Sequence, residues 1–133
     1  MTRKVPVTLT IAGSDNSGGA GIQADLKTFT RYGVYGTTAV TCVVAEHPGR
    51  VSRITAEKPS MVAEQIRLVF EAFPLAAAKT GMLFSSGIIR AVAQEMRRRR
   101  KAKLVVDPVM VATSGAPLLK RDAERALAVE LFP

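Results

Sequence analysis

The sequence predicts an α/β fold in which a mostly parallel sheet is flanked by helices, within one domain of 133 residues. Short apolar runs alternate with longer segments of helical periodicity, which is the pattern of successive right-handed βαβ units. Glycine, proline or serine stands at most boundaries between these segments. The chain is 47% hydrophobic but only 5% aromatic, as expected of an aliphatic core between helices and a sheet.

The first half of the chain predicts two main strands with one helix between them. Residues 5–12 form an apolar run that predicts a buried strand ended by a glycine. Residues 21–33 carry apolar side chains at spacings of three and four and predict a helix. Residues 35–45 predict the second strand, and residues 51–55 predict a brief edge strand after a Pro-Gly turn.

The second half repeats the alternation of helix and strand. A helix is expected to open at Pro59, and another at Ser85 or Ser86, since serine is a preferred N-cap residue. Strands are expected at residues 76–83 and 103–106, before a last helix near the C-terminus. Ligands of parallel sheets bind beyond the carboxyl ends of the strands, so the residues that follow each strand form the candidate site.

The net charge of +8 suits an acidic partner, but much of it lies in one run, residues 97–101. The run follows a helical pattern, where cations interact favourably with the helix dipole and extend into water. No aromatic residues interleave it, as binding of single-stranded nucleic acid would favour. We therefore interpret the run as a solvated helix end and expect no nucleic-acid partner.

The single cysteine, Cys42, excludes an intramolecular disulfide and fits a reducing compartment. It lies within an apolar run, so a buried thiol is a better interpretation than a nucleophile. No segment approaches the roughly 18 apolar residues that a membrane span needs. We expect a cytoplasmic protein with no membrane partner.

The segment GSDNSGGAGIQAD, residues 13–25, places several glycines before a predicted helix start, which favours binding of anions or polar ligands. It lacks the lysine of a P-loop. The dinucleotide pattern G-x-G-x-x-A matches at Gly19, Gly21 and Ala24, but a stretch of loop separates Gly19 from the expected strand end. A dinucleotide domain and a purely structural turn remain alternatives for this segment.

Polar residues also stand near the ends of the later strands. Lys79 begins a Lys-Thr-Gly tripeptide that occurs in penicillin-recognising serine enzymes, but the sequence lacks their S-x-x-K motif. Asp107 follows the strand at residues 103–106, beside a flexible Thr-Ser-Gly turn where a magnesium-phosphate group could be held. A turn-starting Asp-Pro is the alternative interpretation of Asp107.

Five motifs occur in a specific order: TIAGSD, GGAGIQADLKTF, GVYGT, KTGML and VVDPVM, the last followed by SG-PLL. With these motifs, the chain from about Leu9 onward resembles the hydroxymethylpyrimidine/phosphomethylpyrimidine kinases of the ribokinase superfamily. The resemblance implies a three-layer ribokinase-like fold. Residues 1–133 would form the N-terminal part of a single kinase domain whose C-terminal half is missing.

The activity that the resemblance implies is transfer of the ATP γ-phosphate, with Mg²⁺, to 4-amino-5-hydroxymethyl-2-methylpyrimidine in thiamine biosynthesis. The monophosphate product would be the second substrate, and the full protein would be a homodimer. The catalytic residue and most of the ATP site are expected downstream of Pro133, so the chain alone is expected to be inactive. The alternative is a non-catalytic module that binds an aminopyrimidine or pyridoxal-like ring.

The resemblance also assigns site residues. Those expected to contact the pyrimidine are Gly18, Gly19, Gly21, Asp25, Glu46, Met82 and Val109. Lys79 and Asp107 are expected near the phosphates, with Asp107 as the candidate magnesium ligand.

Three positions depart from the pattern of the family. Glu46 stands where the family has a glutamine, and an ionised carboxylate accepts hydrogen bonds but cannot donate one to a ring nitrogen. Thr113 and Ala116 replace the usual lysine and aspartate, which puts the second phosphorylation in doubt because a cation is lost. The neighbouring His47 is interpreted as a solvated loop residue.

Overall fold

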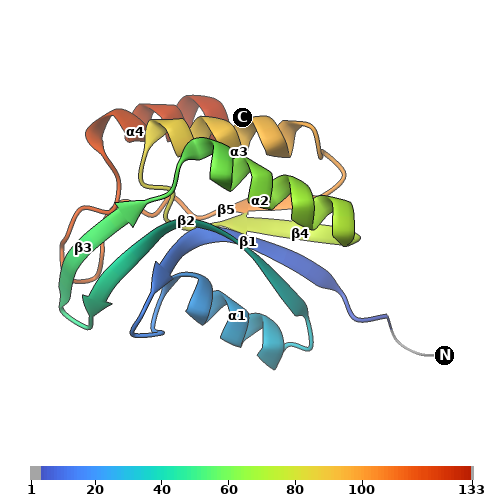
Figure 1. Cartoon of the computed structure of the whole chain (residues 1–133), viewed down its shortest axis with the longest axis horizontal. Helices are drawn as coiled ribbons and strands as arrows, with labels where there is room; N and C mark the ends of the chain where they lie inside the picture. Colours follow the sequence, from blue (N-terminus) through green and yellow to red (C-terminus); the bar gives the residue numbers. More distant parts are fainter. Residues whose placement is uncertain (1–3, 133) are drawn as a thin grey trace.

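The computed structural model describes residues 4–132 and confirms the α/β fold with a mostly parallel sheet (Figure 1). The strands are β1 (Val7–Asp15), β2 (Tyr35–His47), β3 (Arg50–Ala56), β4 (Leu75–Thr80) and β5 (Lys103–Val106). The helices are α1 (Gly21–Arg31), α2 (Pro59–Ala72), α3 (Ser86–Arg97) and α4 (Arg121–Ala126), which continues into a π-helical turn, η1 (Leu127–Leu131). Ser85 is the N-cap of α3 and is one of the two serines that the sequence predicted for this role.

The five strands form one sheet in the order β3-β2-β1-β4-β5. β1 lies at its centre and pairs in parallel with both β2 and β4, and β5 pairs in parallel with β4. β3 pairs antiparallel with β2 and forms one edge of the sheet, where the sequence had predicted a brief edge strand at residues 51–55. The carboxyl ends of β1, β2, β4 and β5 therefore lie on one side of the molecule, where a ligand site is expected.

Helices cover the two faces of the sheet unequally (Figure 1). α1 lies alone on one face and has no fully buried residue, whereas α2, α3 and α4 cover the other. The main hydrophobic cluster lies on that second side, where residues such as Leu9 and Ile11 of β1 pack with Val62, Ile66 and Ile88 of the helices. Burial of such aliphatic side chains is the main stabilising contribution of this core.

The first strand is longer than predicted and does not end at Gly13. β1 continues to Asp15, with an irregularity between Ala12 and Ser14. A Cβ atom at Gly13 would lie 3.0 Å from the sulfur of Cys42, so a larger residue here would crowd that buried thiol where β1 and β2 lie close together. The opposite error affects β4, which was predicted to reach residue 83 but ends at Thr80.

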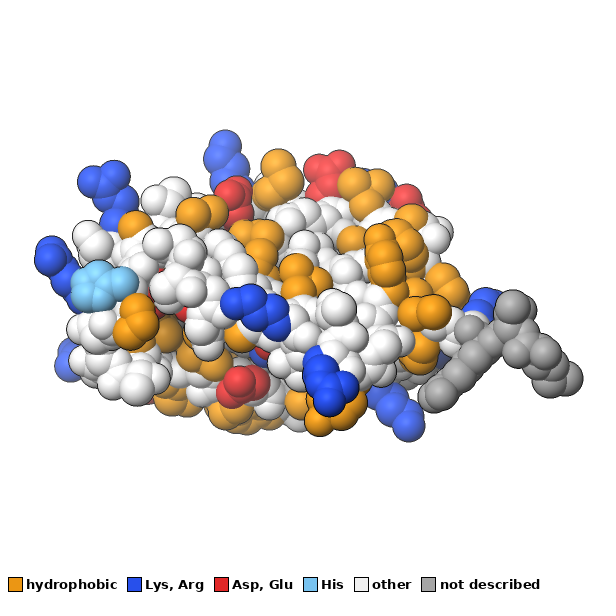
Figure 2. Space-filling model, turned by 90° about the horizontal axis from the view of Figure 1, so that it is seen from below, with side chains coloured by type: hydrophobic (Ala, Val, Ile, Leu, Met, Phe, Trp, Pro, Cys, Tyr) orange, Lys and Arg blue, Asp and Glu red, His pale blue; other side chains and the backbone are white. Residues whose placement is uncertain are grey.

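The thiol of Cys42 is buried, as predicted, and burial raises its pKa. Over residues 4–132, no helix combines the length and the apolar character that crossing a membrane requires. Figure 2 shows the face that carries α1, where hydrophobic patches alternate with Lys and Arg side chains and the pale blue histidine lies at the surface. That residue is His47, the last residue of β2 and exposed.

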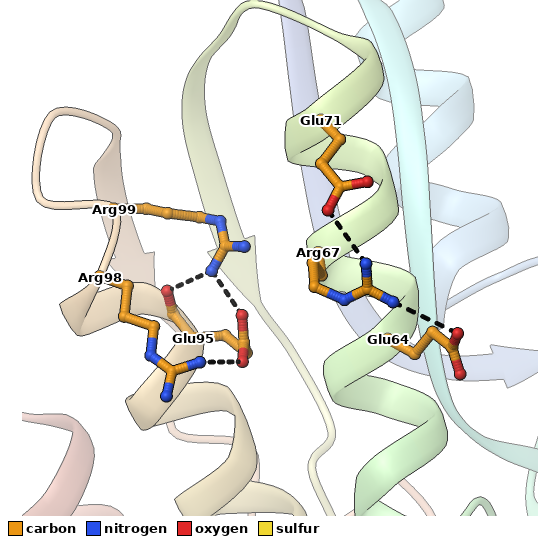
Figure 3. A network of polar contacts seen from close by, with 6 residues as sticks. All are labelled: Glu64, Arg67, Glu71, Glu95, Arg98 and Arg99. Atoms are coloured by element: carbon orange, nitrogen blue, oxygen red, sulfur yellow. Dashed lines mark hydrogen bonds and ion pairs between the residues drawn. The ribbon is translucent and has the colours of Figure 1, made fainter.

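The basic run after α3 is only partly the solvated helix end that the sequence suggested. Arg98 is 72% exposed, but the side chain of Arg99 is only 18% exposed. Figure 3 shows that both guanidinium groups pair with Glu95, whose side chain is 10% exposed. The guanidinium of Arg99 also lies 4.9 Å from the ring centre of Phe70 on α2, so it joins α3 to α2 through a cation–π contact.

Replacing Arg99 with Gln is therefore expected to lower the free energy of unfolding by about 1 to 3 kcal/mol, because Glu95 loses a charged partner in a mostly buried position. The exposed Arg100 is the matched control, and Arg100→Gln should change stability by less than about 0.5 kcal/mol. Urea denaturation of both variants measures the difference. Equal stabilities would show that the contacts of Arg99 with Glu95 and Phe70 contribute nothing measurable.

Candidate ligand site

A cavity of about 570 Å³ lies beyond the carboxyl ends of the parallel strands. Four segments far apart in the sequence line it: the loop between β1 and α1, the end of β2 with the turn to β3, the end of β4, and the chain after β5. Its volume is within the range of small-molecule sites in proteins. The position agrees with the general rule for ligand sites of parallel sheets.

Most residues predicted for the site line this cavity. Those that do so are Gly19, Gly21, Asp25, Glu46, Lys79, Met82, Asp107 and Val109. Gly18 was also predicted, but it is not among the lining residues. Gly18 has φ of +78°, and its N–H donates to the carbonyl of Asp15 at 3.0 Å, so it closes the turn after β1.

Asp15, at the end of β1, organises the glycine-rich loop and was missed in the sequence. Its carboxylate is almost completely buried and accepts hydrogen bonds from the N–H and hydroxyl of Ser17 and from the N–H groups of Gly19 and Ala20. Burial by itself raises the pKa of this carboxyl, but the hydrogen bonds, first that of the Ser17 hydroxyl, outweigh it and lower the pKa of Asp15. The N–H groups expected to bind an anion are thus occupied by a carboxylate of the chain itself.

Asp25 and Lys79 were assigned to different parts of the ligand, but the structure joins them. The Lys79 ammonium lies 3.0 and 3.2 Å from the two carboxylate oxygens of Asp25, between α1 and the sheet. The buried hydroxyl of Thr10 donates to the same carboxylate. This ion pair forms a polar part of the cavity wall in which both charges are compensated.

Glu46 lines the cavity next to Asp15, and its backbone is held by the loop after β1. Beyond Asp15, β2 has no further partner in β1, and the side-chain oxygen of Asn16 accepts the Glu46 N–H at 2.7 Å. Burial, and then the Asp15 carboxylate, raise the pKa of Glu46. His47 also contributes to the cavity rim, and its Nδ1 is 2.8 Å from the carbonyl of Pro48.

The apolar part of the lining comes partly from a hairpin-like loop after β5. Met82 belongs to a buried cluster with Cys42 and Val44, against which Val109 and Leu118 pack. The bridge between Val111 and Pro117 closes the hairpin, and its tip places Thr113 and Ser114 at the cavity. The cavity lining therefore combines apolar side chains with the carboxyl of Glu46.

The chain after the hairpin is joined to the segment between β4 and α3 through Phe84, which bridges Leu119 and has an uncommon φ of +68°. The Phe84 carbonyl accepts the N–H of Lys120, whose ammonium lies 5.2 Å from the Phe84 ring centre. Sequence reasoning missed this bend because no glycine or asparagine marks it.

Within residues 4–132, no group of three or more His, Cys, Asp or Glu side chains could hold a metal ion by itself. Asp107 is an exposed carboxylate at the cavity. Magnesium in kinases is commonly bound by one or two carboxylates together with phosphate oxygens, so a single aspartate fits that arrangement only if a nucleotide completes it.

A family model described as "Phosphomethylpyrimidine kinase" matches residues 15–133, which is most of the chain. The chain belongs to the phosphomethylpyrimidine kinase family. The hydroxymethylpyrimidine/phosphomethylpyrimidine kinase of Rhizobium meliloti is 46% identical over 127 residues, covering 96% of this chain and 47% of the relative. The relatives that match are longer, and the chain spans between about a quarter and about half of their length.

Two solved structures confirm the ribokinase-like fold over about half of their length. The phosphomethylpyrimidine kinase of Clostridium difficile is 44% identical, with a TM-score of 0.89, and the match covers 96% of this chain and 55% of that one. A pyridoxal kinase of Staphylococcus aureus in complex with AMP-PCP and pyridoxal is 35% identical, with a TM-score of 0.81, covering 98% and 46%.

The geometry of this kinase family member does not fit the dinucleotide alternative. In a dinucleotide domain, the N–H groups of the glycine turn and the following helix must be free to bind a pyrophosphate. Here the N–H groups of Gly19 and Ala20 donate to Asp15 at 3.0 and 2.8 Å. A pyrophosphate would have to displace a buried carboxylate that is already well hydrogen-bonded.

Proposed function

We propose that this chain supplies the pyrimidine-binding half of a kinase that transfers a phosphoryl group from ATP to 4-amino-5-hydroxymethyl-2-methylpyrimidine in thiamine biosynthesis. One observation carries the proposal: eight of the nine residues predicted for the site line a single cavity at the carboxyl ends of the strands. The similarity to phosphomethylpyrimidine kinases over nearly the whole chain supports the same substrate class.

In this proposal the ring lies against Met82 and Val109, with its amino edge toward Glu46. The hydroxymethyl group points toward the ion pair of Lys79 with Asp25, which orients it. Mg²⁺ held by Asp107 and the nucleotide phosphates would neutralise charge that develops on the transferred group. The group that activates the hydroxyl, and most of the ATP site, belong to a C-terminal half outside this chain.

Membership of this family also supports proposals on the oligomeric state, the compartment and the further ligands of the complete protein. The complete protein would be a homodimer in the cytoplasm, a compartment that the single buried thiol fits. The monophosphate is a candidate second substrate. A pyridoxal-like ring is the alternative ligand, because the similar Staphylococcus aureus structure is a pyridoxal kinase in complex with pyridoxal.

The purified 133-residue chain is expected to bind hydroxymethylpyrimidine but to form no detectable phosphorylated product with ATP and Mg²⁺. Positioning and charge stabilisation supply most of the rate of phosphoryl transfer, and their expected donors lie outside the chain. A thermal-shift titration with the pyrimidine, pyridoxal and NADH compares ligands, and chromatography of reaction mixtures detects product.

The full-length Rhizobium meliloti relative is the positive control, and the same protein cut to its matching region should also lose activity. Turnover by either short chain would contradict the assignment of catalysis to a second half. A shift with NADH and none with either ring compound would contradict the proposed ligand class.

A further inference from the structure

The carboxyl end of β2 extends beyond the strand that pairs with it in parallel. The pairing of β1 with β2 ends at Asp15 and Val44, whereas β2 continues to His47 and pairs there with β3. A ribbon of two strands is only marginally stable by itself in water. The residues that reach the cavity from this ribbon therefore need a further contact to hold them in place.

The side chain of Asn16 supplies such a contact. Its oxygen accepts the N–H of Glu46 at 2.7 Å, just beyond the last paired residue of β1, so it replaces the backbone acceptor of a longer strand. Among the described residues, no other side chain of the loop at residues 16–20 is hydrogen-bonded to the ribbon. Asn16 is exposed and does not line the cavity, so it can act on a ligand only through Glu46.

The pairing of β2 with β3 is irregular at the same place. The register shifts between Ala45 and Glu46, which leaves Ser52 of β3 without a partner. Bulges of this kind turn a side chain relative to the sheet and are common next to ligand sites. The bulge and the bond to Asn16 therefore both act on the orientation of Glu46, whose side chain lines the cavity.

We propose that Asn16 is a positioning residue, which holds the carboxyl end of β2 so that the side chain of residue 46 keeps its place in the cavity wall. Asn16 and Glu46 both lie outside the five motifs of the family resemblance, so this pair is a feature of the chain itself. The consequence for the ligand rests on the proposed function: residue 46 contacts the amino edge of the ring only while Asn16 accepts this bond.

The test measures whether the effect of residue 46 on binding depends on Asn16. In calorimetric titrations near neutral pH, Glu46→Gln is expected to tighten binding of hydroxymethylpyrimidine about tenfold, because an amide can donate to a ring nitrogen. In a protein that also carries Asn16→Ala, the same substitution should change Kd by about twofold or less. Such a double-mutant cycle separates the coupling of two residues from their individual effects on the fold.

Two further variants are the controls, each measured with and without Glu46→Gln. Asn16→Asp keeps an oxygen acceptor and should keep the tenfold difference. Ser52→Ala replaces the unpaired residue of the bulge, which is exposed and outside the cavity, and should keep the difference as well.

An NMR titration of the Glu46 carboxyl tests the positioning without a ligand. Burial, and then the Asp15 carboxylate, raise the pKa of Glu46. Asn16→Ala should move this pKa toward that of an ordinary glutamate, because the released side chain gains contact with water and moves away from Asp15. Ser52→Ala should leave the pKa unchanged.

A tenfold difference that persists with Asn16→Ala would overturn the inference and show that Asn16 only shapes its loop. An equal loss of the difference with Ser52→Ala would also overturn it, and so would the absence of any difference while Asn16 is present. Failure of the wild-type protein to bind the pyrimidine would instead contradict the proposed function. The NMR titration would then decide the positioning by itself: a lowered pKa with Asn16→Ala would support it, and an unchanged pKa would overturn it.

Discussion

Replacing Gly21 with Ala is expected to lower the free energy of unfolding by about 3 kcal/mol or more and to abolish ligand binding. Gly21 begins α1 with φ of +58°, in the left-handed region that L residues rarely adopt. An added Cβ would also overlap the carbonyl oxygen of Gly13 and lie 3.3 Å from the N–H nitrogen of Asp15. Both neighbours are backbone atoms of β1, so neither can rotate away, and the loop that holds Asp15 must move.

Gly33→Ala is the matched control for this change. Gly33 has φ of +69°, but no atom lies within 4 Å of where its Cβ would be. Its substitution should therefore cost only the left-handed conformation, about 1 to 2 kcal/mol, and leave binding intact. Urea denaturation and calorimetry of both variants separate steric overlap from backbone strain. Equal losses of stability would show that the overlap of the new Cβ at Gly21 with the Gly13 carbonyl is relieved without loss of folding free energy.

Much of the fold was predictable because its elements carry strong local signals. The strand at residues 103–106 was predicted with the observed bounds, since a short apolar run is enclosed by polar and charged residues. The bounds of β1 were wrong because a glycine also permits close packing of strands, and sequence alone does not distinguish that role from a turn. Arg99 was misassigned because its partner Phe70 lies on another helix.

The site was predicted as a set of residues but not as a set of contacts. Motifs placed Asp25 and Lys79 at the cavity, yet their ion pair joins α1 to β4, two segments that are distant in the sequence. Asp15 was passed over because the glycines beside it carried the expected anion-binding role. An acidic residue before a glycine-rich helix start is the available signal, since a carboxylate binds the same free N–H groups that an anion would.

Glu46→Gln is expected to tighten binding of hydroxymethylpyrimidine near neutral pH, by on the order of 1 to 3 kcal/mol, if the carboxyl faces the amino edge of the ring. An ionised carboxylate accepts hydrogen bonds only, so it leaves an unprotonated ring nitrogen without a donor, whereas an amide can donate to that nitrogen. The measurement is a calorimetric titration of the wild-type protein and of the variant with hydroxymethylpyrimidine. Glu64→Gln, an exposed carboxylate on α2 outside the cavity, is the matched control.

The pH dependence of binding distinguishes a direct contact of Glu46 from an indirect effect. Burial and the Asp15 carboxylate raise the pKa of Glu46, so a proton shared between this carboxyl and the ring is lost at a higher pH than for an ordinary glutamate. Wild-type binding should weaken as pH rises through that apparent pKa, and the Gln variant should lose this part of the dependence. Because ionisation of a carboxyl with a raised pKa costs folded-state stability, the Gln variant should also gain stability relative to wild type over the same rise in pH. A gain in stability with an unchanged binding profile would place the carboxyl of Glu46 in the cavity wall but away from the ring, and the alignment of Glu46 with the family's glutamine would then be wrong.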